Sequence, residues 1–176
     1  DAALPRPEVL AEVLGALLPA PAAIVGVRAD EGMGASDVLD AARAALREAG
    51  VRVCFARGRA SGQCAPFEAL ATAILDAVGA QSLSPLRLAA DRLLERIREV
   101  GEDPAGWGVD ALIGGLVGVG PAGARGAATM EAFRVCEAIL APSHRPVVLV
   151  FDDADGVDPQ TWEVARALVA RPGGGV

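Results

Sequence analysis

The stretch VVLVFDD at residues 147–153 decides the fold of this chain. Its continuous apolar run predicts a buried strand at residues 146–151, which two carboxylates follow directly. The ligands of open parallel sheets bind at the carboxyl ends of the strands. One carboxylate there can hold Mg²⁺, usually through water, and the next can orient an attacking water. Asp152 is therefore a candidate metal ligand and Asp153 the candidate catalytic residue, although the pair alone also suits a solvated acidic turn.

The second informative stretch is ADEGMGAS at residues 29–36, between a predicted strand at 22–28 and a predicted helix that begins near Ser36. A phosphate needs backbone N–H groups, glycines that allow close approach, and a helix N-terminus with its partial positive charge. A strand, a glycine-containing loop and a helix provide these, although an ordinary turn between strand and helix has the same composition. Together and in this order, the two motifs indicate nucleotide-binding ancestry.

The loop departs from the full phosphate-loop pattern G-x-x-x-x-G-K-S/T at two positions. Gly34 and Ser36 match, whereas Ala29 replaces the first glycine and Ala35 replaces the lysine. Arg28 is the nearest cation in the sequence, but an arginine fork is no compact substitute for a lysine. The candidate nucleotide-binding residues are Gly32, Gly34, Ala35, Ser36 and Asp37, and Ser36 is also a candidate metal ligand beside Asp152.

Strands alternate with helices along the chain, which predicts an α/β fold whose parallel sheet is flanked by helices on both faces. Asp158 reads as the N-cap of the last helix and Gly50 as the stop of the second. The Gly- and Pro-rich segment 102–126 reads as a flexible connection. The expected helices are 7–18, 36–50, 66–79, 84–101, 128–141 and 159–170, and the expected strands are 22–28, 51–57 and 146–151.

Composition limits the classes of function. The chain has 176 residues, of which 52% are hydrophobic, and a net charge of −7 without any lysine. An acidic domain without an arginine cluster is a poor nucleic-acid binder. Arg57 and Arg59 read as surface charges, with contact to a partner as the alternative. Three cysteines without CxxC spacing favour reduced thiols over a disulfide framework or a metal site. No apolar run reaches 18 residues, so we expect a cytoplasmic protein without membrane contact.

The segment VVLVFDDADGVDPQTWEVARAL at 147–168 resembles the Walker B region of STAND-type AAA-like ATPase domains. These domains occur in large bacterial regulators of the LuxR/MalT and AfsR kind. EGMGAS at 31–36 is similar to the phosphate loop of that family, and GRASGQCAPFEALATAIL at 58–75 to the segment after its second strand. Asp155 and Gly156 stand where the family usually has His and Trp.

The resemblance implies a P-loop domain over residues 1–176 that would bind ATP and Mg²⁺. In the family, a further strand separates the phosphate-loop strand from the Walker B strand. We expect that strand beyond Val176, which would make this chain a truncated part of a larger regulator whose DNA-binding part lies elsewhere. Other domains of the same polypeptide, the nucleotide and further copies of the chain are the expected partners.

Three functions remain open on the sequence. The first is an ATP-binding regulatory module with weak or no hydrolysis, because Ala35 cannot neutralise the β- and γ-phosphates. The second is a pseudo-ATPase scaffold that binds no nucleotide, which the degraded Ala29 and Ala35 favour. The third is an active ATPase in which the lysine was changed to alanine. The intact pair Asp152 and Asp153 favours the first or the third.

Overall fold

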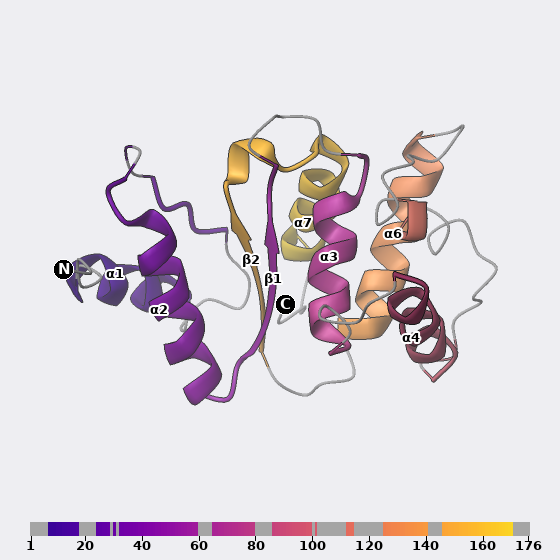
Figure 1. The fold of residues 1–176 in the computed structure, drawn as a ribbon, viewed down its shortest axis with the longest axis horizontal. Helices are drawn as coiled ribbons and strands as arrows, with labels where there is room; N and C mark the ends of the chain where they lie inside the picture. Colours follow the sequence, from indigo (N-terminus) through magenta and orange to yellow (C-terminus); the bar gives the residue numbers. More distant parts are fainter. Residues whose placement is uncertain are drawn as a thin grey trace.

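The structure is a computed structural model that describes residues 7–17, 24–28, 30, 32–59, 65–79, 86–99, 101, 112–114, 125–140 and 146–170. Within these residues, the strands β1 (Arg52–Arg57) and β2 (Val147–Asp152) form a parallel sheet with helices on both sides (Figure 1). The helices are α1 (Pro7–Leu17), α2 (Ala35–Glu48), α3 (Glu68–Ala77), α4 (Leu86–Glu99), α6 (Arg125–Leu140), the 3₁₀ turn η2 (Ala154–Gly156) and α7 (Pro159–Ala170). The predicted α/β class is confirmed.

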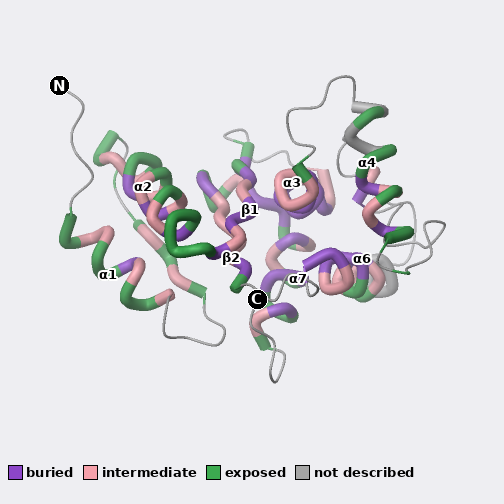
Figure 2. Tube along the Cα trace, turned by 90° about the horizontal axis from the view of Figure 1, so that it is seen from below, coloured by how far each residue is buried: buried purple, intermediate pink, exposed green. Residues whose placement is uncertain are grey.

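The two strands bury alternate residues on opposite faces, as the period of two in a strand requires. On one face, Val53 of β1 and Val148 and Val150 of β2 pack with Leu46 of α2. On the other face, the strands join a larger core with residues of α3, α4, α6 and α7. Figure 2 shows the buried residues gathered on the strands and on α3, α6 and α7. Helices therefore cover both faces of the sheet.

The register of the sheet fixes which residues meet at its carboxyl edge. Arg52 lies opposite Val147, and the pairing continues without interruption to Arg57 opposite Asp152. Because both strands run in the same direction, their last residues come together at one edge. Gly50, with φ of 79°, ends α2 and turns the chain into β1, and its N–H donates to the Arg47 carbonyl at 3.0 Å. The predicted stop at Gly50 is confirmed, since glycine adopts this left-handed conformation without strain.

Asp158 caps α7 and also fastens α3 to it. Its Oδ1 accepts the N–H of Thr161 at 2.8 Å, as predicted for an N-cap, and the N–H of Phe67 at 2.9 Å. Its Oδ2 accepts the Thr161 hydroxyl at 2.7 Å, and that oxygen in turn accepts the N–H of Leu70 at 3.1 Å. Phe67, with φ of 64°, is therefore held at the start of α3 by a buried carboxylate.

Polar side chains also fasten the outer side of β1. Asp76 of α3 accepts the N–H of Phe55 at 2.8 Å. Arg52 donates to the carbonyls of Ala77 and Ile139, at 2.5 and 3.4 Å, near the C-terminal ends of α3 and α6. A cation at a helix C-terminus interacts favourably with the helix dipole. The backbone of β1 on the side away from β2 is thus bonded in part to a side chain, that of Asp76.

The predicted strand at 22–28 is wrong for its described part. Residues 24–28 are not in a strand, and Ile24 is 54% exposed. A strand needs hydrogen bonds to a neighbour, and no strand among the described residues pairs with this segment. An apolar run indicates a tendency towards a sheet but cannot supply the partner. Direct closure of this segment on β2 does not occur in the described part of the chain.

Other boundaries shift by one or two residues, except that α6 begins three residues earlier than expected, at Arg125. Helix α3 begins at Glu68 rather than Pro66, because Pro66 and Phe67 form a turn. Most of the predicted connection at 102–126 lies outside the described residues, except a helical turn at 112–114 and the start of α6 at Arg125. No described helix combines the length and apolar character that crossing a bilayer requires.

Candidate functional site

The loop before α2 is shaped by two glycines in the left-handed conformation. Gly32 has φ of 76° and Gly34 has φ of 81°, values that other residues adopt only with strain. The N–H of Met33 donates to the Asp30 carbonyl at 3.0 Å, and the N–H of Val38 donates to the Gly34 carbonyl at 3.1 Å. Gly34 thus ends the loop and starts the helix. Ala29 and Glu31 lie outside the described residues.

Ala35, Ser36 and Asp37 form the first turn of α2. Their backbone N–H groups have no partner within the helix, since no helical carbonyl precedes them by four residues. Such a turn carries partial positive charge and suits an anion. The side chain of Ala35 adds no charge to it. An added Cβ on Gly34 would lie 3.4 Å from Asp37 Oδ2, so the Asp37 carboxylate is close to the loop.

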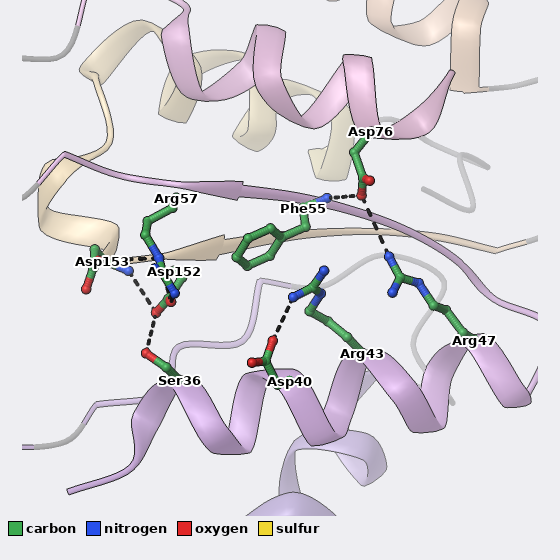
Figure 3. A network of polar contacts seen from close by, with 9 residues as sticks. All are labelled: Ser36, Asp40, Arg43, Arg47, Phe55, Arg57, Asp76, Asp152 and Asp153. Carbon is green, nitrogen blue, oxygen red and sulfur yellow. Dashed lines mark hydrogen bonds and ion pairs between the residues drawn. The ribbon is translucent and has the colours of Figure 1, made fainter. Parts of the chain in front are cut away.

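The structure brings Ser36 next to Asp152 across 116 residues of sequence. The Ser36 hydroxyl donates to Asp152 Oδ1 at 3.1 Å (Figure 3). Ser36 comes from the helix after the loop and Asp152 from the end of β2, whose carboxyl edge faces the start of α2. The side chain of Asp152 is 6% exposed, so its charge is largely withdrawn from water.

Arg57 is the residue of this site that the sequence reasoning missed. Its Nη2 and Nε lie 2.7 and 3.1 Å from Asp152 Oδ2, and its Nε lies 3.7 Å from Asp153 Oδ2. The hydrogen bond and the charge of Asp152 raise the pKa of Arg57 above its usual value. Arg57 lies on the surface, as expected, with 59% of its side chain exposed, and its pairing with Asp152 is what the sequence did not predict. Its place as the last residue of an expected strand was the available signal, but the pairing of the strands was needed to use it.

Asp152 has every lone pair engaged. Its Oδ1 accepts from the Ser36 hydroxyl and from the N–H of Asp153, both at 3.1 Å, and its Oδ2 accepts both bonds from Arg57. A carboxylate offers about four acceptor positions. The two oxygens are therefore saturated by groups of this chain.

Asp153 differs from its neighbour in exposure and conformation. Its side chain is 55% exposed, and its backbone is left-handed with φ of 50°. This conformation begins the 3₁₀ turn η2, and the Gly156 N–H donates to the Asp153 carbonyl at 2.8 Å. The candidate catalytic carboxylate is thus in water at the rim of the site, near the Arg57 guanidinium (Figure 3).

Two glycines allow the loops after β1 and β2 to touch backbone to backbone. A Cβ on Gly58 would lie 2.1 Å from the Asp153 carbonyl oxygen, and one on Gly156 would lie 2.3 Å from the Arg59 carbonyl oxygen. The Gly58 N–H donates to the backbone carbonyl of Asp152 at 2.8 Å, and the Arg59 N–H donates to the carbonyl of Gly156 at 3.2 Å. The tryptophan that the resembled family has at position 156 would not fit here. This contact holds Arg57 and Asp152 in place.

A hollow of about 220 Å³ lies beside the loop, between α1 and the start of α2. Its walls are largely apolar, with one cation and one carboxylate. Its lining includes Val9, Val27, Arg28, Asp30, Met33, Gly34, Ala35 and Val38. Pockets that enclose a whole ligand are usually about 300–1,000 Å³, so this hollow suits one part of a ligand. Arg28, the nearest cation in sequence, lines the hollow, whereas Arg57 is the cation bound to Asp152.

The residues present fit a Mg²⁺-bound phosphate in part. Ser36 and Asp152 supply two hard oxygen ligands 3.1 Å apart, and Mg²⁺ commonly uses one or two protein oxygens with several waters. The first-turn N–H groups of α2, which have no partner within the helix, suit phosphate oxygens. Among the described residues, no group of three or more His, Cys, Asp or Glu side chains could hold a metal ion alone. The fit fails at Ala35, where no ammonium is available.

A glycine-shaped loop that opens a helix, with a carboxylate at the end of a parallel strand beside it, defines a P-loop type of nucleotide-binding domain. The comparison with protein families agrees, because the model described as AAA ATPase domain matches residues 6–174. The chain belongs to the AAA ATPase domain family. Searches of curated proteins and of solved structures found no significant match.

Proposed function

We propose that this domain binds ATP with Mg²⁺ and serves as a regulatory module with weak or no hydrolysis. The observation that carries the proposal is the contact between Ser36 and Asp152 at the start of a helix that Gly34 opens in the left-handed conformation. Membership of the AAA ATPase domain family supports nucleotide as the ligand.

Each part of the site has a task in this proposal. The first-turn N–H groups of α2 would hold phosphate oxygens, and the hollow beside Val9 and Val27 would take an apolar part of the nucleotide. Ser36 and Asp152 would hold Mg²⁺, which would supply neutralisation of phosphate charge. Asp153 orients water at the rim. Hydrolysis is weak because Ala35 leaves the charge that develops on the γ-phosphate without a lysine.

The regulatory role rests on the resemblance of residues 147–168 to the Walker B region of STAND-type regulators. In such a protein, nucleotide binding would change how this domain contacts other domains of the same polypeptide. The signal-responsive and DNA-binding parts would lie outside this segment, which fits its acidic net charge of −7.

A scaffold that binds no nucleotide is the second candidate. The observation in its favour is the saturated Asp152, whose acceptor positions are all used by Ser36, Arg57 and the Asp153 backbone. With Ala35 in addition, the edge is stable without any ligand. This candidate retains the fold and uses its helical surfaces for other domains.

Isothermal titration calorimetry of the full-length protein with ATP, in Mg²⁺ and in EDTA, separates the two candidates. We expect weak binding that requires Mg²⁺. Loss of a desolvated lysine contact costs about 1.5–3 kcal/mol, or roughly ten- to a hundredfold in affinity. Ser36→Ala is the matched variant, because it removes one metal ligand from an exposed position and should abolish the Mg²⁺ effect. Absence of binding in both buffers would favour the scaffold, and tight binding in EDTA would contradict the proposed geometry.

A further inference from the structure

We propose that Arg57 is an internal counter-ion that competes with Mg²⁺ for Asp152 and thereby sets the metal affinity of the site. The inference deepens the proposed function and rests on it for the identity of the metal. It starts from the saturated carboxylate. A metal ion, or a water bound to one, can reach an Asp152 oxygen only after a present donor leaves.

Arg57 is the donor that can leave most easily. The Asp153 N–H is fixed in the backbone, and Ser36 is itself a candidate metal ligand that would turn with the ion. The Arg57 side chain is 59% exposed, so its guanidinium can move into water, while the incoming metal ion takes over the neutralisation of the buried Asp152 carboxylate. Moving the Asp153 N–H would disrupt the loop after β2, and moving Ser36 away would separate the two candidate metal ligands.

Arg57 also opposes the metal by its charge. Two cations that share one carboxylate repel each other, and the effect at an exposed edge is modest because water screens it. The guanidinium binds Asp152 Oδ2 through two nitrogens, a geometry that a single ammonium cannot reproduce. Without metal, Arg57 neutralises Asp152. With metal, Arg57 is displaced towards Asp153, whose carboxylate already lies 3.7 Å from its Nε.

Arg59 provides a matched control. It stands two residues later, carries the same charge and is 58% exposed, almost the same as Arg57. Its Nε pairs with Glu68 at 2.6 Å instead of Asp152. Arg57→Gln and Arg59→Gln therefore change the net charge equally, and only the first frees an Asp152 oxygen.

Mn²⁺ titration of the full-length protein without nucleotide, followed by the electron paramagnetic resonance of free Mn²⁺, tests the proposal. We expect Arg57→Gln to tighten Mn²⁺ binding roughly three- to tenfold, from the lost ion pair and the lost repulsion. Arg59→Gln should bind Mn²⁺ as the unchanged protein does. Arg57→Lys, which keeps the charge and loses the fork, should lie between them. In Arg57→Gln combined with Asp152→Asn, the gain should disappear, which assigns it to this carboxylate.

Equal Mn²⁺ affinity in Arg57→Gln and the unchanged protein would overturn the proposal, as would an equal gain in Arg59→Gln. Circular dichroism of each variant checks that the fold is retained, and Arg57→Lys keeps the test informative if Arg57→Gln unfolds. Weaker ATP binding in Arg57→Gln without any Mn²⁺ gain would assign the guanidinium to the phosphates and overturn the proposal too. A Mn²⁺ gain in a protein that binds no nucleotide would uphold the counter-ion and contradict the proposed function.

Discussion

At the scale of single residues, two positions define the site: position 35, which has alanine instead of lysine, and Arg57, whose role at Asp152 the sequence did not predict. Ala35 stands at the start of α2, where the phosphate-loop pattern has a lysine, and Arg57 places a positive charge beside Asp152 from the neighbouring strand. Arg57 does not replace the missing lysine. A lysine at position 35 would lie at the phosphates, whereas Arg57 is bound to the carboxylate that would hold the metal.

Ala35→Lys should strengthen ATP binding by roughly ten- to a hundredfold, because it restores a charge-assisted contact worth about 1.5–3 kcal/mol. Calorimetry in Mg²⁺ measures the change. Ala44→Lys is the control, since Ala44 is exposed on the same helix two turns further along. No gain in Ala35→Lys would mean that the loop no longer cradles a phosphate, and the scaffold would then be the better description.

Gly58→Ala should lower the free energy of unfolding by about 1–3 kcal/mol, because the new Cβ would meet the rigid Asp153 carbonyl at 2.1 Å. Gly15→Ala is the opposite control. Gly15 lies in α1 with nothing within 4 Å of an added Cβ, so alanine should stabilise that helix by about 0.5–1 kcal/mol. Urea denaturation measures both. Equal stabilisation by the two changes would show that the loops after β1 and β2 are not in contact.

At the scale of elements, the packing of α3 against α7 depends on one polar network. Asp158 and Thr161 satisfy two backbone N–H groups at the start of α3 as well as one of α7. Their side chains are buried, so water cannot reach these N–H groups, and each N–H depends on the Asp158 or Thr161 oxygen that accepts it. The sequence predicts the cap of α7, while the link to α3 is a property of the assembled fold.

Asp158→Ala should lower the free energy of unfolding by about 2–4 kcal/mol, the sum of a lost cap and a buried N–H of Phe67 left without a partner. Asp158→Asn should cost less, because one oxygen can still accept from Phe67 and Thr161. Thermal or urea denaturation of the two variants measures the difference. An alanine cost no greater than that of an ordinary exposed cap, near 1 kcal/mol, would contradict the link between the helices.

At the scale of the whole molecule, two features matter for stability and association. The core contains buried thiols, and one side of β2 is not paired with any described strand. Burial raises the pKa of the Cys54 thiol from its ordinary value of 9.0 to about 11, and burial raises that of Cys136 as well. On the sheet, β2 has β1 on one side, and no other described strand pairs with it.

The free energy of unfolding should fall between pH 9 and pH 11. Below pH 9 the thiols are protonated in both states, and above it the unfolded chain ionises while buried Cys54 remains protonated to about pH 11. At about 1.4 kcal/mol per pH unit, Cys54 accounts for roughly 2–3 kcal/mol. The chain has no Lys or Tyr to titrate in this range. Urea denaturation across this range measures the slope of the unfolding free energy against pH. In the control, Cys54→Ala combined with Cys136→Ala, most of that slope should disappear.

The isolated 176-residue chain should associate with itself at high concentration. Among the described residues, no strand pairs with the side of β2 away from β1, where backbone N–H and C=O groups follow the apolar run PVVLVF at 146–151. This run carries no charge that would protect such an edge. Sedimentation velocity over a range of concentrations measures this. A monomer at every concentration would show that another segment covers the edge of β2.

The sequence by itself determined the class of the fold and most of the elements. Apolar runs and helical spacing located β1, β2 and the helices to within about three residues, because burial and periodicity are local properties of the chain. Pro159 and Asp158 marked the start of α7, and Gly50 marked the end of α2. The candidate residues Ser36 and Asp152 also followed from local patterns, since a phosphate loop and a strand-end carboxylate are each contained in one short segment.

The tertiary structure alone decided which of these segments meet. The run at 22–28 has the composition of a strand, yet residues 24–28 are in none, because a strand exists only with a partner. The sequence around Arg57 indicates only a surface charge, and it is the register of the two strands that places Arg57 opposite Asp152. Hydrogen bonds between segments 95 or 116 residues apart depend on strand order and register. Those are set by how the whole core packs, and local sequence does not encode them.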